Sequence, residues 1–439
     1  TAGPGLTNAV TGIAAAFLEA REVLVIGGQV KTEDLSDGTI RQLGIQEING
    51  VELVDSICVK SERMLRPWGA SELGEFLHLD TYSRSGPLFL EVPIDVQGRN
   101  FETLDLNTSE VPSRDIGREK PVSKMKELKE LLSKSERPVL LIGGGVSFEL
   151  ALSLKDELAD CGIPIMTTWN GADRVDNFGD NYMGRPNTWG QRYSNVLIQQ
   201  CDLLIAVGTR LGLQQTGFNW REFASKAKVV QIEIDEGELA KERPHKDLSI
   251  LWDANLALPE VLTLIYLVSD SKWDSWMDFC RKVKDMLPLS EQSNSNFEGF
   301  WNPYDFFALI SGSLKGGDRL IPSSSGSSFT VGYQASKTGL GVRMLSSKSL
   351  ASMGNGLGTT IGAALTSNGT TVLVEGDGGF AQNLQDLGTL RDLGKSVKIF
   401  LWDNGGYGSI RATQKSYFDG HYVGCDANTG LVLPNWELI

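Results

Sequence analysis

One stretch of this chain, residues 370–408, constrains its fold more than any other part of the sequence. It contains two short apolar runs, at 372–374 and 397–402, and between them a segment, 380–393, in which apolar residues recur at helical spacing. Short runs rich in β-branched residues are typical of buried strands, and a strand, a helix and a second strand in this order form a βαβ unit. The sequence therefore predicts two strands of a parallel sheet in this stretch.

Oxygen-bearing side chains and glycines follow each of the two predicted strands. Asp377 ends the first strand, Asn404 ends the second, and the glycines beside Asp377 are Gly376, Gly378 and Gly379. Ligands of open parallel sheets bind at the carboxyl ends of strands, where glycines let backbone N–H groups approach an anion. A carboxylate, an amide and an exposed backbone carbonyl suit a hard cation that keeps phosphate oxygens in its shell, so the pattern predicts a Mg²⁺ site. The alternative is an ordinary strand–helix turn without phosphate.

Strand and helix patterns also alternate in two earlier regions of the sequence, which is typical of α/β domains. Between these regions the chain is polar and irregular, and these parts are interpreted as linkers. We therefore predict an α/β protein with three doubly wound parallel-sheet domains, at residues 1–110, 123–265 and 301–439. The predicted strands lie at 22–28 and 86–93 in the first domain, at 138–142, 163–168, 202–208 and 228–235 in the second, and at 319–322, 372–374 and 397–402 in the third.

Composition narrows the class of protein. The net charge is −14 at pH 7, which argues against a nucleic-acid partner. No apolar run approaches the length of a membrane span, so no membrane partner is expected. The five cysteines are scattered without a CxxC motif, which favours buried thiols in a reducing compartment and predicts a cytoplasmic location.

The Gly-Asp-Gly motif at 376–378, followed by a helix, a strand and Asn404, resembles the signature of thiamine diphosphate (ThDP) enzymes. In that family the aspartate, the asparagine and the carbonyl two residues after the asparagine bind Mg²⁺, which holds the diphosphate of ThDP. The resemblance therefore implies that Asp377, Asn404 and the carbonyl of Gly406 are metal ligands. The glycines that it implies for cofactor binding are Gly376, Gly378 and Gly379.

Other segments resemble the acetolactate synthase large (catalytic) subunit and related carboligases of sugar biosynthesis. Residues 1–8 (TAGPGLTN) and 93–97 (PIDVQ) are similar to parts of their pyrimidine-binding domain. Residues 352–358 (SMGNGLG) are similar to a segment whose bulky apolar side chain forces ThDP into a bent shape, which implies this role for Met353. The hydroxyl-rich segment after the strand at 319–322 suits the diphosphate, with a flexible serine loop as the alternative. Its candidate cofactor-binding residues are Gly326, Ser327 and Ser328.

The middle region resembles the domain that holds FAD in acetolactate synthase and pyruvate oxidase. Its predicted strands end in glycines, an arginine and aspartates, residue types that suit a diphosphate and a ribose or adenine. The resemblance makes FAD an expected cofactor, but many ThDP enzymes keep this domain without a nucleotide, and the sequence leaves both interpretations open. The candidate FAD-binding residues are Gly143, Gly144, Gly145, Thr167, Gly208, Arg210, Asp235 and Asp253.

One residue expected of the family does not occur at its place in this sequence. The essential glutamate of the family lies upstream of its Gly-Pro-Gly segment, which here occupies residues 3–5, and neither Glu19 nor Glu47 is assigned its role. The sequence also begins without a methionine. We therefore expect the first and last domains to be incomplete, as in a piece of a longer protein. If the sequence is complete, catalysis is expected to be crippled.

The resemblance implies a ThDP- and Mg²⁺-dependent carboligase, a transferase that decarboxylates a pyruvate-like 2-oxo acid and transfers the acyl unit to a second carbonyl substrate. Alternatives within enzymes are transfer of a two-carbon unit to a keto-sugar nucleotide, simple decarboxylation of a 2-oxo acid, and flavin-dependent oxidation. The alternative from another class is a non-catalytic ThDP- or nucleotide-binding protein. Because the cofactor lies between subunits in this family, a homodimer or homotetramer with active sites at the interface is also expected.

Overall fold

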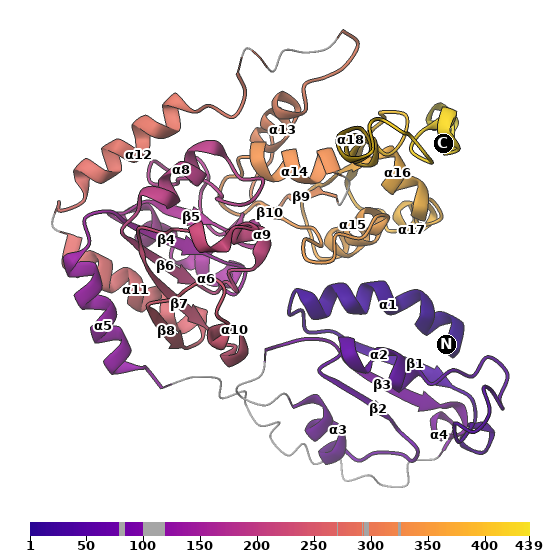
Figure 1. Cartoon of the computed structure of the whole chain (residues 1–439). Coiled ribbons are helices and arrows are strands. Elements are labelled where there is room, and N and C mark those ends of the chain that lie inside the picture. Colours follow the sequence, from indigo (N-terminus) through magenta and orange to yellow (C-terminus); the bar gives the residue numbers. More distant parts are fainter. Residues whose placement is uncertain (79–83, 100–118, 270, 292, 294–297, 324–325) are drawn as a thin grey trace. The chain divides into compact units, whose positions relative to one another are not determined.

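The computed structural model describes residues 1–78, 84–99, 119–269, 271–291, 293, 298–323 and 326–439 (Figure 1). Its backbone contacts divide the chain into two compact units. The first consists of Thr1–Ile116 with Ser349–Ala351, and the second of Gly117–Lys348 with Ser352–Ile439. The first unit contains one parallel sheet and the second contains two, which confirms the predicted α/β class with three parallel sheets.

The first unit is built on a three-stranded sheet with the order β1-β3-β2. Its strands and helices are β1 (Leu24–Gln29), β2 (Lys60–Arg63), β3 (Leu88–Pro93), α1 (Gly3–Leu18), α2 (Gly50–Val54), α3 (Ala70–Leu77) and α4 (Ile94–Gln97). Successive residues of a strand point to opposite faces of a sheet. Accordingly, Phe89 packs with Leu6 and Ile13 of α1. Leu88 and Leu90, on the opposite face, pack with Phe76 of α3. Helices thus cover both faces, as a parallel sheet requires.

The larger sheet of the second unit has five strands in the order β5-β4-β6-β7-β8. Its strands are β4 (Pro138–Ile142), β5 (Ile165–Thr167), β6 (Leu203–Val207), β7 (Lys228–Glu233) and β8 (Leu248–Leu251). The helices around it are α5 (Val122–Lys134), α6 (Phe148–Ser153), α7 (Lys155–Ala159), α8 (Arg192–Gln200), α9 (Leu213–Thr216), α10 (Glu236–Ala240), α11 (Ala254–Ser269) and α12 (Asp274–Met286). The polar strand ends meet at one edge, because all five strands run in parallel.

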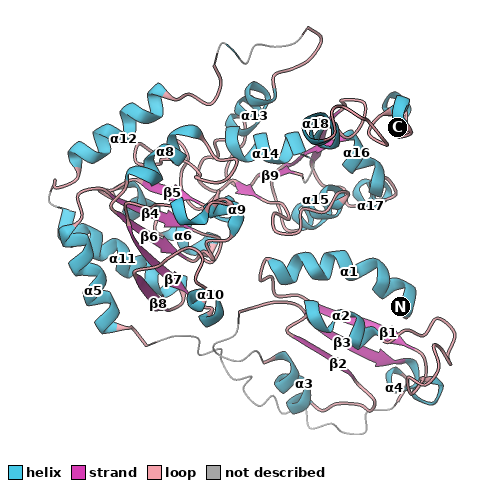
Figure 2. Cartoon of the chain, in the orientation of Figure 1, coloured by secondary structure: helices cyan, strands magenta, loops and turns pink. Residues whose placement is uncertain are grey.

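Alternating residues of β4 divide the core of this sheet into two layers. Leu140 and Ile142 pack with residues of α5, α6, α7 and α11, whereas Val139 and Leu141 pack with residues of α8 and α12. Figure 2 shows the helices that cover the two faces. The sheet is therefore doubly wound, as the sequence predicts.

The smaller sheet of the second unit has four strands in the order β10-β9-β11-β12. Its strands are β9 (Arg319–Pro322), β10 (Arg343–Met344), β11 (Thr371–Gly376) and β12 (Val397–Trp402). The helices that belong to it are α13 (Pro303–Gly312), α14 (Gly326–Ala335), α15 (Asn355–Leu365), α16 (Asp377–Phe380), α17 (Asp386–Asp392) and α18 (Gly408–Tyr417). One face of the sheet packs with α13 and α14, and the other with α15 and α17.

The predicted βαβ unit is present, but its connection is not one helix. β11 and β12 pair in parallel from Thr371 opposite Val397 to Gly376 opposite Trp402. The prediction of a continuous helix over 380–393 is wrong, because a short 3₁₀ turn, Ala381–Asn383, separates α16 from α17. The amide of Asn383 in this turn donates to the carbonyl of Gly354 (2.6 Å), so a contact with a distant segment accompanies the interruption.

Two further predictions concern membrane spans and thiols. No helix formed by the described residues is both long and apolar enough to cross a membrane. All five cysteines are buried free thiols. Their burial confirms the buried thiols that the sequence predicts.

The carboxylate of Asp202 offers a test of how the larger sheet is held together. It accepts hydrogen bonds from the hydroxyl of Ser135 and from the backbone N–H groups of Glu136 (2.8 Å) and Arg137 (2.9 Å), and so joins the beginnings of β6 and β4. We expect Asp202→Ala to lower the free energy of unfolding by about 2 kcal/mol, because these donors lose a charged acceptor. Urea unfolding checks the change, with Asp160→Ala at an exposed site as the matched control. Equal stability of the two variants would contradict it.

Candidate functional site

A cavity of about 840 Å³ lies at the carboxyl ends of β11 and β12, within the second unit. This is the edge of the sheet at which the sequence predicts ligand binding. The cavity brings together most of the residues predicted for the metal and the diphosphate. The predicted residues that line it are Gly326, Ser327, Met353, Gly376, Asp377, Gly378, Gly379, Asn404 and Gly406.

The carboxylate of Asp377 joins the two strand ends at the floor of this cavity. The side chain is buried, and its Oδ1 accepts from the N–H of Gly378 (2.8 Å) while its Oδ2 accepts from the N–H of Gly406 (2.8 Å). Burial raises the pKa of Asp377 and the neighbouring carboxylate of Asp403 raises it further, whereas the two N–H donors lower it. A cation bound beside Asp377 would favour its charged form and so oppose both effects that raise its pKa.

Asn404 and Gly406 occupy the loop that follows β12. The Oδ1 of Asn404 accepts from the guanidinium of Arg411 (3.2 Å), and the same guanidinium donates to the backbone carbonyl of Asn404 (2.8 Å). Gly406 has a φ of 139°, and a Cβ at this position would lie 2.2 Å from the carbonyl oxygen of Cys425. Only glycine fits here, because other residues would need both an unfavourable backbone conformation and space that Cys425 occupies.

Two other glycines of the cavity lie so close to residues 407–409 that a larger side chain would not fit. A Cβ on Gly378 would lie 2.2 Å from the ring of Tyr407, and a Cβ on Gly326 would lie 2.0 Å from the hydroxyl oxygen of Ser409. Met353 is partly exposed and lies over the same turn, since its Cε is 3.6 Å from the Cβ that Gly378 lacks. The site therefore combines exposed backbone with an apolar side chain above it.

Ser328 differs from its neighbours in the serine-rich segment. Its side chain is buried, its hydroxyl donates to the carbonyl of Ser323 (3.4 Å), and it is not among the residues that line the cavity. Ser327 and Gly326, at the start of α14, are the members of the segment that reach the cavity. Residues 324 and 325 of the segment lie outside the described residues.

The donor set of the cavity fits a cation that carries a diphosphate. Within the described ranges, no group of three or more His, Cys, Asp or Glu side chains could hold a metal by itself. A cation at Asp377 would therefore depend on the amide of Asn404, on a backbone carbonyl such as that of Gly406, and on oxygens of the ligand. This is the coordination that Mg²⁺ has at phosphate sites, where few protein ligands are supplemented by phosphate oxygens and water.

Glu375, which the sequence did not single out, is a buried carboxyl group next to Gly376 of the cavity lining. It is completely buried, and burial raises its pKa to about 7. One carboxyl oxygen accepts from the hydroxyl of Ser323, and the other has no hydrogen-bond partner among the described residues. Cβ atoms on Gly356 and Gly379 would lie 1.7 and 2.4 Å from the carboxyl oxygens. A charged residue within an otherwise apolar strand run was the available signal in the sequence.

One wall of the cavity is apolar. It contains Phe300 and Trp301, both largely exposed, together with the side chains of Phe306 and Ile399. Trp301 contacts Phe306 edge to face, with ring centroids 6.2 Å apart. Trp273, earlier in the chain, is buried, whereas Trp301 is exposed and lines the cavity.

The candidate FAD-binding residues lie at the carboxyl edge of the five-stranded sheet, but protein contacts already account for several of them. Cβ atoms on Gly143 and Gly145 would lie 2.1 and 2.9 Å from backbone atoms of Gly208, so the two strand-end loops require glycine in order to approach each other. The hydroxyl of Thr167 lies 3.2 Å from that of Tyr182. The other candidates also have protein contacts. Gly144 lies beside Asn170, and the backbone carbonyl of Arg210 accepts from the amine of Lys241. The carboxylate of Asp235 accepts from a backbone N–H at the start of α10, and that of Asp253 accepts from the N–H of Asn255.

Glu47 has a structural role in the first unit. Its carboxylate accepts from the backbone N–H groups of Ser36 (2.6 Å), Leu43 (2.8 Å) and Gly44 (3.0 Å). These bonds hold the 36–44 loop, so the side chain is occupied by its own backbone.

Comparison with known proteins identifies similar sequences over most of the chain. The N-terminal TPP binding domain of the thiamine pyrophosphate enzymes matches residues 1–53, their central domain matches 125–261, and their C-terminal TPP binding domain matches 325–437. The acetolactate synthase large subunit of Cyanidium caldarium is 29% identical, over 96% of this chain and 72% of its own length. The acetolactate synthase isozyme 2 large subunit of Escherichia coli is 27% identical, over 96% and 74%. The probable acetolactate synthase large subunit of Methanocaldococcus jannaschii is 28% identical, over 95% and 71%.

Two glycines of α15 test how tightly the floor of the cavity is packed. We expect Gly356→Ala to lower the free energy of unfolding by about 1–3 kcal/mol, because its Cβ would overlap the buried carboxyl of Glu375. Gly358→Ala, two residues along the same helix, is expected to raise it by about 0.5–1 kcal/mol, since its Cβ meets nothing within 4 Å and alanine favours a helix. Urea unfolding of both variants measures the difference. Changes of the same sign would contradict the packing described here.

Proposed function

The chain belongs to the thiamine pyrophosphate enzymes, and from this premise we propose that it is a ThDP- and Mg²⁺-dependent carboligase of the acetolactate synthase type. The proposed reaction is decarboxylation of a pyruvate-like 2-oxo acid and transfer of the remaining acyl unit to a second carbonyl compound. The observation that carries the proposal is the cavity at the ends of β11 and β12, where Asp377, Asn404 and Gly406 lie together. The acetolactate synthases among its relatives supply the reaction class.

In this proposal the residues of the cavity bind and orient the cofactor. The carboxylate of Asp377, the amide oxygen of Asn404 and the carbonyl of Gly406 hold Mg²⁺. Gly378 and Gly379 expose backbone at the start of α16, where an anion is favoured. When bound, ThDP would supply a carbon nucleophile for the keto carbon and an acceptor for the electron pair that the loss of CO₂ leaves behind.

Two other residues of the cavity complete the proposed cofactor site. Ser327 offers a hydroxyl to the diphosphate at the start of α14. Met353 lies above the Gly-Asp-Gly turn, where its apolar side chain supports the bent shape of the cofactor. Both assignments depend on the same cavity as the metal ligands, so a test of cofactor binding addresses them together.

FAD binding by the five-stranded sheet is a separate part of the proposal. Its support is the match of residues 125–261 to the central domain of the family and the position of the candidate residues at one sheet edge. Visible flavin absorbance of the purified protein, retained through gel filtration, tests it. A homodimer or homotetramer is proposed from the family resemblance, and sedimentation analysis of the same sample measures it.

The reaction is tested by pyruvate-dependent release of CO₂ from the purified protein with ThDP and Mg²⁺, followed by identification of the organic product. We expect CO₂ and acetolactate. Acetaldehyde as the sole product would favour a decarboxylase, or a carboligase that lacks its acceptor, and addition of a keto-sugar nucleotide separates these. Uptake of O₂ with flavin turnover would favour an oxidase. ThDP binding without any CO₂ from a panel of 2-oxo acids would favour the non-catalytic alternative.

Metal dependence is tested separately by ThDP binding. We expect Asp377→Asn to weaken Mg²⁺-dependent ThDP binding at least about tenfold, because the variant loses a charged ligand and turns an N–H donor toward other N–H donors. Calorimetric titration with ThDP at several Mg²⁺ concentrations measures the effect, and Asp392→Asn, at the exposed end of α17, is the matched control. Unchanged binding in Asp377→Asn would refute the metal assignment.

A further inference from the structure

Helix α14 connects the candidate cofactor cavity with the loop that follows β5 in the five-stranded sheet. Its first residues, Gly326 and Ser327, line the cavity. Its last turn, which ends at Ala335, meets residues 169–191 of that loop. At about 1.5 Å per residue the ten-residue helix is about 15 Å long, and its regular backbone hydrogen bonds join the two ends.

Side chains from the loop bind the backbone carbonyls at the end of α14. The guanidinium of Arg185 donates to the carbonyl of Ser336, and the amide of Gln191 donates to the carbonyl of Gln334 (3.0 Å). Gln191 is itself held, because its Oε1 accepts from the N–H of Arg185 (2.6 Å). The last carbonyls of a helix have no partner within the helix, and a capping group from elsewhere satisfies them.

The charge of Arg185 is compensated by this helix end. The side chain is 1% exposed, and its other contacts are weak, with Oδ1 of Asn177 at 3.5 Å and Sδ of Met344 at 3.9 Å. Among the residues that the structure describes, none forms an ion pair with Arg185. A buried cation without a partner is costly, and the C-terminal end of a helix carries partial negative charge that stabilises it. The position of Arg185 therefore depends on α14, and that of α14 on Arg185.

Aromatic packing holds the same helix against the loop. The ring of Trp169 stacks on Tyr333 of α14 with centroids 5.1 Å apart, and it contacts Phe329 edge to face at 5.0 Å. Both Trp169 and Tyr333 are buried. The side chain of Gln334 also donates to the carbonyl of Trp189 (2.6 Å). These contacts hold the side of α14 against the loop, whereas Arg185 and Gln191 bind the carbonyls at its C-terminal end.

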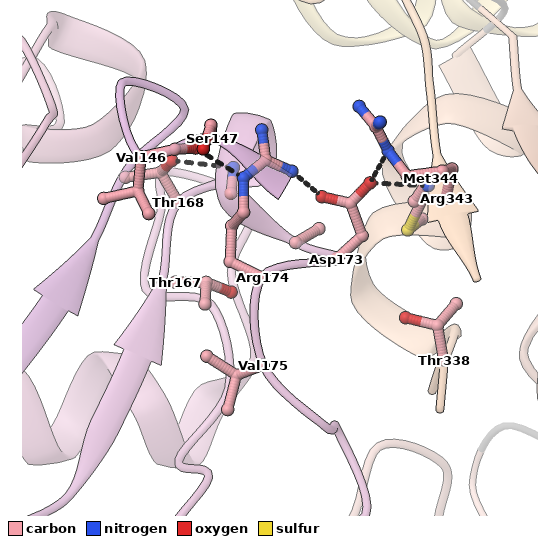
Figure 3. Close-up of polar contacts among 12 residues, drawn as sticks. Val146, Ser147, Thr167, Thr168, Asp173, Arg174, Val175, Thr338, Arg343 and Met344 are labelled. Carbon is pink, nitrogen blue, oxygen red and sulfur yellow. Dashed lines mark hydrogen bonds and ion pairs between the residues drawn. The ribbon is translucent and has the colours of Figure 1, made fainter. Parts of the chain in front are cut away.

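A second connection joins the loop to the strand that follows α14 (Figure 3). Asp173 accepts from Nε of Arg343 (3.0 Å) and from the N–H of Met344 (3.0 Å), and it forms an ion pair with Arg174. Arg174 in turn donates to the carbonyl of Val146, just after β4 (2.6 Å). The loop is thus connected to the five-stranded sheet on one side and to the cofactor-binding sheet on the other.

We propose that Arg185 is a positioning residue for the cofactor, which holds α14 from its C-terminal end so that Gly326 and Ser327 stay in place for the diphosphate. It does not touch the ligand. This inference rests on the proposed function, in that the ligand of the cavity carries a diphosphate. It gives the five-stranded sheet a role in cofactor affinity that is independent of FAD.

The test compares three variants of the full chain. Arg185→Met removes the charge at similar length, Arg185→Lys keeps the charge, and Arg192→Met changes an exposed arginine that contacts Pro288 and Glu291 but not α14. Titrations with ThDP–Mg²⁺ and with inorganic pyrophosphate–Mg²⁺ measure affinity. We expect Arg185→Met to weaken both about tenfold, Arg185→Lys to recover part of the loss, and Arg192→Met to match the unchanged protein.

Hydrogen exchange separates positioning from general destabilisation. In Arg185→Met we expect faster exchange in α14 and unchanged exchange in β4 and β6. Unchanged affinity despite faster exchange in α14, or faster exchange throughout the unit, would overturn the inference. If Arg185→Met does not fold, the same criteria apply to Arg185→Lys.

The unsubstituted protein separates this inference from the proposed function. If it binds ThDP and pyrophosphate but releases no CO₂, the proposed reaction fails, and the variants still decide this inference. If it binds neither, the cofactor site itself fails, and the inference fails with it.

Discussion

The two hydrogen bonds accepted by the carboxylate of Asp377 determine the geometry of the candidate site. One oxygen of the carboxylate accepts from the N–H of Gly378, just after β11, and the other accepts from the N–H of Gly406, beyond β12. The carboxylate thus holds together two loops that the sheet alone would leave apart. Parallel strands present their carboxyl ends at one edge, but they do not fix the loops beyond that edge. A buried carboxylate between these loops does so, and in the proposed function the same carboxylate is the charged ligand of the metal.

The site is built mainly from backbone, and this explains its glycines. Gly326, Gly378 and Gly406 each lie where a Cβ would overlap a neighbouring segment. Below them, Glu375 fills the space left by Gly356 and Gly379 and contacts Ser323 at the end of β9. Burying a carboxyl group without a charged partner is unfavourable, and the raised pKa of Glu375 is the expected response. The floor of the cavity therefore has little space to accept larger side chains.

The five-stranded sheet contributes to the same unit through side chains of one loop. Arg185 and Gln191 reach α14, and Asp173 reaches the segment that contains Arg343. Because these contacts are buried and polar, they have defined directions, whereas the stacking of Trp169 on Tyr333 is less directional. The position of a helix that lines the cavity is thus determined partly by a different sheet.

The sequence by itself determined the parallel sheets and the βαβ unit with Asp377 and Asn404 at its strand ends, because apolar periodicity and the direction of strands are local properties of the chain. It also indicated Met353 and Gly406 through their motifs. It did not show the interruption between α16 and α17, where Asn383 contacts Gly354, or the burial of Glu375. Only the tertiary structure decided these features and the contact of Arg185 with Ser336, 151 residues away, because each depends on groups that folding brings together from distant segments.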